Sequence, residues 1–255
     1  MVQLLTRQVG YPIEVEIVRG ETAADLLRFG AQLDQGTYHV AAVWGLEYGW
    51  LRQQYGDLRA LALMRQQDAQ YYCQIMVRRG AGLNDFAQLK GKHLANYPRM
   101  TLMQTVFLQK LLEQQDSSVD AFFGQTTQFP TVTSAINKVH KGIADCVVVD
   151  TILYSRHIAN QPNINLAVIQ PVQPMPQSVL IGRRDRTESL RAGLWQDVQE
   201  KLSQIHTTPQ GRQCVDFWRI ERFTLPNDQY EQLVTKCVRE FPITILEREA
   251  AVRSR

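Results

Sequence analysis

The stretch "HLANYPRMTLMQTVFLQKLLEQQ" (residues 93–115) places a short apolar strand pattern directly before a long segment with helical spacing. The same order continues through "DAFFG", predicted as a strand, and the helical "TVTSAINKVHKG" to the apolar run "ADCVVVD", which ends at Asp150. Strand and helix patterns that alternate in this way are typical of strands joined by crossover helices. The stretch therefore predicts an α/β fold with largely parallel sheets.

A similar alternation precedes this region. "IEVEIV" (13–18) alternates at period two, and the segment after it places Ala24, Leu27 and Ala31 on one helical face before Gly36. "HVAAVWG" and "LRALALM" predict two more strands, with an amphipathic segment between them. This β-α-β-α-β order predicts a first lobe.

Two strand patterns, "YYCQIMVRR" (71–79) and "SVLIGRR" (178–184), bracket the second alternating series, and the latter follows the proline-rich "PVQPMPQ". The chain would cross from one lobe to the other and back. We therefore expect a two-lobed clamp with two hinge strands, in which 1–75 and 180–255 form lobe one and 76–179 form lobe two. The cleft of such a clamp is a common place for small ligands. Three helical patterns complete the chain: 187–205, 208–218 and 226–240.

Composition excludes several classes of protein. The net charge of +3 comes from 28 basic and 25 acidic residues scattered along the chain. Binding of duplex nucleic acid requires a basic stripe, so we expect no nucleic acid partner. The four cysteines form no C-x-x-C pair and the five histidines lack ligand spacing, so we expect no metal and no cofactor. No apolar run reaches the length of a membrane span, and "MVQLLTRQVG" is too polar for a signal peptide. These features predict a soluble chain, which we expect to be a monomer.

Enzyme motifs are missing as well. The sequence has no G-x-S-x-G elbow, no G-x-x-x-x-G-K-[ST] loop and no G-x-G-x-x-G after a strand. Cys146 has His140 near it in sequence, but it lies within an apolar strand pattern and has no evident activating base. The sequence therefore favours a binding protein over an enzyme.

The strongest candidate pair for binding is Arg99 with Thr101, where a strand pattern runs into a helix. Helix N–H groups and the positive end of the helix dipole attract anions, and Arg and Thr add further donors. The alternative is a surface arginine beside an ordinary N-cap. Asp150 offers a similar choice, since it can accept bonds from a ligand's amino group or protonated oxygen, or cap a helix starting at Thr151.

A second group follows "HVAAV", at the carboxyl end of a predicted strand: Trp44, Glu47 and Tyr48. Open α/β sheets bind ligands at this edge, although Trp and Tyr also serve widely as packing residues. Thr126 and Thr127 follow the predicted strand "AFFG" and can donate hydroxyl hydrogen bonds, or simply form a polar loop.

Two segments, "DFAQLKGKHLANYPRMTLMQTVFLQKLL" and "INKVHKGIADCVVVDTILYSRH", resemble the phosphate/phosphite/phosphonate-type substrate-binding proteins of ABC transporters. This family is a branch of the two-lobed, type II periplasmic binding protein fold. The resemblance implies that a Ser/Thr-bearing helix start holds the ligand's oxyanion and that an aspartate faces the cleft. Arg99, Thr101 and Asp150 occupy those positions here.

The segment "GTYHVAAVWGLEYGWLRQQYGDLRALALM" is similar to the part of the family that places an aromatic residue near the cleft. Trp44, Glu47 and Tyr48 match it, and Tyr71 or Tyr72 matches the aromatic position of the first hinge strand. Two features depart from the family. The usual Ser-Thr is "PRMT", and the chain starts at what resembles the family's first helix, so we expect that a preceding core strand is missing, through a shortened sequence or degeneration.

The resemblance implies a solute-binding protein that captures phosphate, phosphite or an alkylphosphonate in the cleft between the lobes. It also implies an ABC permease as partner and a place in the periplasm or on the cell surface. A second role stays open, because the same fold also serves as a ligand-sensing domain that signals to a partner protein.

Overall fold

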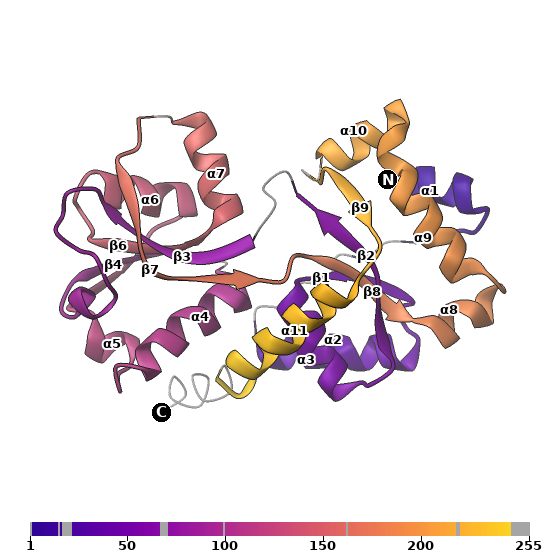
Figure 1. The fold of residues 1–255 in the computed structure, drawn as a ribbon, viewed down its shortest axis with the longest axis horizontal. Coiled ribbons are helices and arrows are strands. Elements are labelled where there is room, and N and C mark those ends of the chain that lie inside the picture. Colours follow the sequence, from indigo (N-terminus) through magenta and orange to yellow (C-terminus); the bar gives the residue numbers. More distant parts are fainter. Residues whose placement is uncertain are drawn as a thin grey trace. The chain divides into compact units, whose positions relative to one another are not determined.

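The computed structural model forms two compact units, one from the described residues of 1–69 and 176–242, the other from those of 70–175 and 243–255 (Figure 1). Three of the six residues of the predicted strand 13–18 lie outside the described residues. The boundary expected at residue 75 falls within a strand that belongs wholly to the second unit. The structure describes residues 2–14, 16, 22–66, 71–98, 100–161, 163–217 and 220–245.

The first unit contains a four-stranded sheet in the order β1 (Val40–Val43), β8 (Val179–Arg183), β2 (Leu58–Arg65) and β9 (Arg222–Thr224). All three neighbouring pairs are antiparallel. Since β8 lies between β1 and β2 and opposes both, those two strands run in the same direction. The strand with which the chain returns from the second unit is therefore inserted into the middle of this sheet.

Helices cover this sheet. A core of α9 and sheet residues includes Leu61, Trp195, Leu202 and Phe223, all at most 5% exposed. The helix predicted over 187–205 is divided in two, because Gly193 takes a left-handed conformation with φ +76°. The helices are α1 (Val2–Val9), α2 (Ala23–Gln35), α3 (Gly45–Gln54), α8 (Arg184–Leu190), α9 (Leu194–Gln204), α10 (Pro209–Phe217), α11 (Asp228–Glu240) and the short 3₁₀ helix η2 (Ile205–Thr207).

The second unit contains a five-stranded sheet. Its order is β5 (Gln125–Gln128), β4 (His93–Asn96), β6 (Cys146–Asp150), β3 (Tyr71–Arg78) and β7 (Leu166–Met175). Among the described strands of both units, only the pairings of β4 with β5 and with β6 are parallel. The expectation of largely parallel sheets was therefore wrong. The physical reason is that β3 and β8, which the chain uses near its crossings between the units, enter each sheet antiparallel to their neighbours.

Residues 171–175 of the proline-rich segment belong to strand β7, at the edge of the sheet, where a proline needs no ladder bond on its outer side. One local prediction in this unit needs correction. The predicted strand "DAFFG" is instead the single-turn helix α5 (Val119–Phe122), and the strand follows it as β5. Its apolar residues are buried by ring contacts, since Phe122 stacks on Phe86 at 4.7 Å.

The second unit has three layers, with the sheet between two layers of helices. In Figure 1, α6 (Val132–His140) and α7 (Thr151–Asn160) lie on one face of the sheet, and α4 (Leu102–Glu113) and α5 on the other. All residues of β6 are buried, as its continuous apolar run predicts for a central strand. A short 3₁₀ helix, η1 (Ala87–Leu89), precedes β4.

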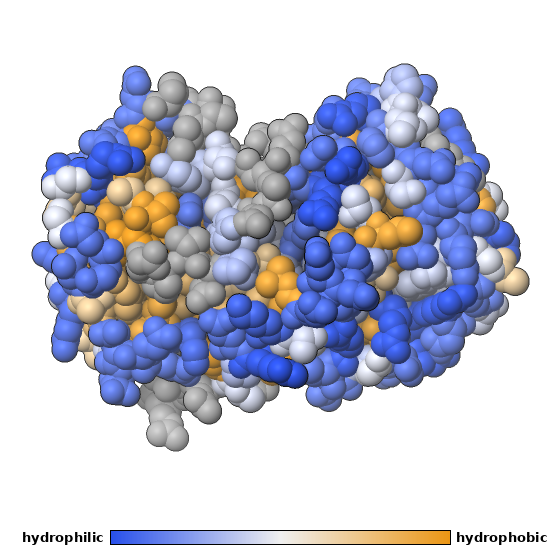
Figure 2. All heavy atoms as spheres, viewed as in Figure 1, coloured by the Kyte–Doolittle hydropathy of each residue, from blue (hydrophilic) through white to orange (hydrophobic). Residues whose placement is uncertain are grey.

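The surface seen in Figure 2 is mainly hydrophilic, with scattered hydrophobic areas. Isolated exposed apolar side chains are usual on folded proteins and need no special explanation. In the described part of the chain, the large apolar residues that remain exposed are Val40, Ile143, Val168, Leu190, Phe217 and Leu225.

Gly45 is a position where the first unit has no room for a side chain. A Cβ there would lie 2.6 Å from the carbonyl oxygen of Gln177 and 2.6 Å from Pro176. We predict that Gly45→Ala lowers the free energy of unfolding by about 1–3 kcal/mol, because overpacking against backbone cannot relax by a rotamer change. Urea-induced unfolding measures the effect.

Gly56→Ala is the matched control for this substitution, since no atom lies within 4 Å of the added carbon. We expect it to change the free energy of unfolding by less than about 1 kcal/mol. Equal losses for the two variants would contradict the close approach of Gly45 to the 176–177 backbone.

Candidate functional site

Three helices begin where three strands of the second unit end. β5, β4 and β6 are neighbours and parallel, and α6, α4 and α7 respectively are the next helices in the chain. Ligands of open α/β sheets bind at this carboxyl edge, and each helix start presents N–H groups and a partial positive charge. The carboxyl edge of the second unit is therefore the place where an anion site can form.

The start of α4 is held by a reciprocal pair of hydrogen bonds. Thr101 is the N-cap, and its Oγ1 accepts from the backbone N–H of Gln104 at 3.2 Å. The Gln104 Oε1 accepts from the backbone N–H of Thr101 at 3.0 Å. The first helical bond runs from the Thr105 N–H to the Thr101 carbonyl, so the N–H groups of Leu102 and Met103 have no acceptor within the helix. These two N–H groups, which lie next to the Thr101 hydroxyl in the first turn, are the donors that α4 can offer to an anion.

Asp150 lies behind this helix start and is 2% exposed. One carboxylate oxygen accepts from the side-chain Nε2 of Gln104 at 2.8 Å, and the other accepts from the backbone N–H of Leu153 at 2.8 Å. The second bond caps α7, which is the structural alternative that the sequence left open. Asp150 thus connects the first turns of two helices.

Two tyrosines complete the polar cluster. The pKa of Tyr71 is raised well above its usual range, first by burial, then by the charges of Cys73 and Asp150 and a hydrogen bond with Asp150. A hydrogen bond with Thr101 opposes this shift. The hydroxyl of Tyr97 lies 3.1 Å from both Gln104 Oε1 and the Val148 carbonyl oxygen, and its single hydrogen is shared between these two acceptors.

The structure therefore brings together three of the predicted site residues, Thr101, Asp150 and Tyr71. It adds two residues that the sequence interpretation missed, Tyr97 and Gln104. Gln104 has a detectable signal, since "TLMQ" fits the capping-box pattern in which a Gln three positions after Thr closes the helix start. Tyr97 has no comparable signal, because nothing in the sequence shows that its hydroxyl reaches Gln104.

The other candidates in this unit lie elsewhere or cannot be placed. Arg99 lies outside the described residues. Thr126 is exposed in the middle of β5, opposite Leu94, and does not follow a strand as predicted. Thr127 accepts or donates a bond with the Nε2 of His93 at 2.9 Å. Tyr72, the alternative to Tyr71, donates its backbone N–H to the hydroxyl of Thr151 at 3.2 Å.

In the first unit, Trp44, Glu47 and Tyr48 lie at the turn from β1 into α3. The Glu47 carboxylate accepts from the Trp44 backbone N–H at 3.0 Å. Tyr48 is 1% exposed, and its hydroxyl donates to Glu231 of α11 at 3.2 Å. Arg52 pairs with the same carboxylate and lies 5.2 Å from the centre of the Tyr48 ring. Tyr48 thus has the packing role that was its structural alternative.

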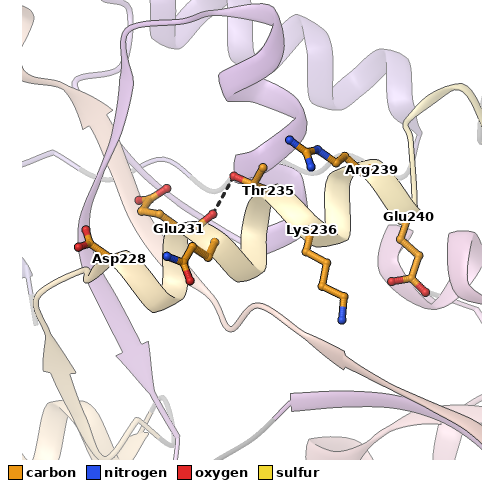
Figure 3. Close-up of a pocket in the computed structure, with 7 residues that line it drawn as sticks. Asp228, Glu231, Thr235, Lys236, Arg239 and Glu240 are labelled. Atoms are coloured by element: carbon orange, nitrogen blue, oxygen red, sulfur yellow. Dashed lines mark hydrogen bonds between the residues drawn. The ribbon is translucent and has the colours of Figure 1, made fainter.

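An open hollow of about 710 Å³ runs along α11 and contains none of the predicted site residues. In Figure 3 its side chains spread along the helix instead of converging. The hydroxyl of Thr235 donates a hydrogen bond to the Glu231 carbonyl oxygen at 2.8 Å. Three acidic groups and two basic groups line it, so the hollow offers no concentrated positive charge to an anion. Its lining residues are Asp228, Glu231, Gln232, Thr235, Lys236, Arg239 and Glu240.

Metal coordination has no support in the part of the chain that the structure describes, where no three His, Cys, Asp or Glu side chains are grouped to hold an ion. The same ranges contain no helix that is long and apolar enough to cross a membrane.

Glu47 makes the first unit sensitive to pH. Burial raises the pKa of its carboxyl to about 7, and the bond from Trp44 opposes this shift. Because the folded pKa lies above the usual value of 4.5, the folded state binds this proton more tightly than the unfolded chain. The contribution of Glu47 is present below pH 4.5 and is lost as the pH rises through 7.

We predict that Glu47→Gln, which keeps an acceptor for Trp44, removes this part of the pH dependence. Urea unfolding at pH 5 and pH 8 measures it, with the variant gaining stability relative to the parent as the pH rises. Glu200→Gln, on the exposed side of α9, is the control. If both variants follow the parent at both pH values, Glu47 does not titrate in this way.

Comparison with known proteins adds independent evidence. No curated protein matches the sequence. Among solved structures, XAC2383 from Xanthomonas citri bound to ATP superimposes with a TM-score of 0.70 at 14% identity, over 96% of this chain and 90% of that one. PhnD1 from Prochlorococcus marinus in complex with methylphosphonate gives 0.65 at 13% identity, over 94% and 90%.

A binding protein component of an ABC phosphonate transporter (PA3383) from Pseudomonas aeruginosa gives a TM-score of 0.58 at 14% identity, covering 100% of this chain and 92% of that one. These likenesses confirm the predicted α/β fold of the type II periplasmic binding proteins. Residues 1–230 match the family described as "ABC transporter, phosphonate, periplasmic substrate-binding protein". The chain therefore belongs to the periplasmic substrate-binding proteins of phosphonate-type ABC transporters.

Proposed function

We propose that this chain captures a small tetrahedral phosphorus oxyanion, namely phosphate, phosphite or an alkylphosphonate, at the start of α4. Binding involves no covalent step. The observation that carries the proposal is the arrangement at Thr101, where a capped helix start leaves two backbone N–H groups without an acceptor in the helix, beside the hydroxyl of Thr101. Family membership supports the ligand class, and so does a neighbour of the same fold that is described in complex with methylphosphonate.

The physical basis of recognition is charge complementarity with little reorganisation. A helix start carries about half a positive charge, and its N–H groups are held in place by the helix itself. A tetrahedral oxyanion has several acceptor oxygens and can accept from Leu102, Met103 and Thr101 together. Arg99, two positions before Thr101, adds a charged donor to the proposed set.

The residues at the turn into α3 have a weaker claim. Trp44, Glu47 and Tyr48 remain proposed contacts on the resemblance alone, because the structure already gives Glu47 and Tyr48 partners within the first unit. Thr126 remains a proposed contact on the same ground. We propose that the protein acts as a monomer in the periplasm or at the cell surface and delivers its ligand to an ABC permease.

Isothermal titration calorimetry with methylphosphonate, phosphate, phosphite, 2-aminoethylphosphonate, sulfate and an alkylsulfonate tests the ligand class. Tight binding confined to phosphorus oxyanions is the expected result. A preference for sulfate or the sulfonate, or no heat with any of the anions from a folded sample, would contradict the proposal.

Substitution of Thr101 tests the place of binding. Thr101→Ala removes one hydrogen bond to a charged ligand, which is worth about 1.5–3 kcal/mol, so we expect roughly 10- to 100-fold weaker binding of the preferred anion. Thr101→Ser keeps the hydroxyl and should bind within about threefold of the parent, a shift of less than roughly 1 kcal/mol.

Loss of the helix cap is controlled by Thr22→Ala in the first unit. Thr22 closes a capping box with Asp25 at the start of α2, as Thr101 does with Gln104. This variant should lose about 1 kcal/mol of stability and keep its affinity for the anion. Equal affinities of Thr101→Ala and the parent would remove the start of α4 from the site.

A further inference from the structure

We infer that Asp150 is a positioning residue for the proposed anion site: it acts through Gln104 and Tyr71 and does not contact the ligand. The inference rests on the proposed function and assigns Asp150 a role different from that of the cleft-facing aspartate implied by the resemblance. It also makes Gln104, which is 0% exposed, a functional residue of the site.

The Asp150 carboxylate is buried and hydrogen-bonded. Asp150 is 2% exposed, and each of its two oxygens accepts a hydrogen bond at 2.8 Å, from Gln104 and from Leu153. The Tyr71 hydroxyl of β3 is a third group beside it. Groups from α4, α7 and β3 therefore surround the carboxylate and leave it enclosed by protein.

The side-chain amide of Gln104 has a fixed orientation. Its Nε2 donates to Asp150, and its Oε1 accepts from the backbone N–H of Thr101 at 3.0 Å and from the hydroxyl of Tyr97 at 3.1 Å. The reversed amide would place its NH₂ group against two donors and its oxygen against a carboxylate. Asp150 thus allows only one orientation of this amide.

Gln104 positions Thr101, the residue proposed to contact the ligand. Gln104 holds both sides of Thr101, because its Oε1 accepts from the Thr101 N–H and its backbone N–H donates to the Thr101 Oγ1. The bond from the Gln104 N–H occupies one of the two lone pairs of Oγ1, and the Thr101 hydroxyl also hydrogen-bonds with Tyr71. The carboxylate therefore holds the Thr101 side chain in place through Gln104, and Tyr71 connects the same two residues by a second route.

The positioning role and simple electrostatics predict opposite effects of Asp150→Asn on anion affinity. Asp150→Asn removes a negative charge near an anion site, so charge alone would tighten anion binding. The Asn side chain, however, offers one acceptor and one donor to positions that both require acceptors, and it disturbs either the cap of α7 or the Gln104 amide. We expect the affinity for methylphosphonate to fall about tenfold, in spite of the lost negative charge.

A second variant separates positioning from helix capping. Asp150→Ser retains an oxygen that can cap α7 but cannot reach Gln104. We expect it to weaken binding as Asp150→Asn does. Asp145→Asn is the matched control, because Asp145 directly precedes β6 and accepts from the His93 N–H at 2.8 Å, away from the carboxyl edge. It should leave the affinity unchanged.

A double-mutant cycle distinguishes a positioning role of Asp150 from a general structural role. Gln104→Leu and Asp150→Asn are combined, and dissociation constants are measured by calorimetry well below the unfolding temperature of each variant. If Asp150 acts through Gln104, the double variant binds no more than about threefold more weakly than either single variant.

The outcomes distinguish the two proposals. Failure of the parent protein to bind any phosphorus oxyanion overturns the proposed function. A parent that binds, together with an Asp150→Asn variant that binds equally or more tightly, overturns the positioning role alone. Additive effects in the cycle overturn it as well.

Discussion

The parallel pairing of β4 with β5 and β6 is the constraint on which the candidate site depends. Parallel strands end at the same edge of a sheet, so the helices that follow them must begin near one another. The starts of α4 and α7 are close enough for the Gln104 side chain to bond Asp150 at 2.8 Å. Without this pairing, the cluster that links Thr101 to Asp150 would not exist.

The polar cluster at this edge is stable because its buried groups have partners. An unpaired buried polar group costs about 1–3 kcal/mol, so a cluster of this kind is favourable only when it is satisfied. Gln104 uses both ends of its side-chain amide and its backbone N–H, and Asp150 uses both oxygens. The donors left over, on the first turn of α4, are those that a ligand can satisfy.

The sequence predicted most elements of the second unit because their patterns are strong and local. The buried run of β6 and the capped, apolar α4 lie where the patterns place them. The parallel arrangement was overestimated, since the direction in which β3 and β8 enter their sheets depends on contacts between distant segments. The apolar "AFF" run was assigned to a strand because three residues carry no period, and ring packing around Phe122 decided the outcome.

The site was predictable only in part. Thr101 and Asp150 were identified because helix starts and strand ends are visible in a sequence, whereas the bond between Gln104 and Asp150 joins residues 46 positions apart. Tyr48 stays a proposed contact, and its hydroxyl bond to α11 depends on a helix more than 180 positions later. Neither contact leaves a local signal.

Backbone amide chemical shifts during a titration with methylphosphonate test whether the anion binds at the start of α4. We expect the ¹H–¹⁵N resonances of Leu102 and Met103 to move downfield and to saturate with the dissociation constant found by calorimetry, because their N–H groups gain an anionic acceptor. Saturable binding that leaves both resonances unchanged would show that the anion binds elsewhere on the protein.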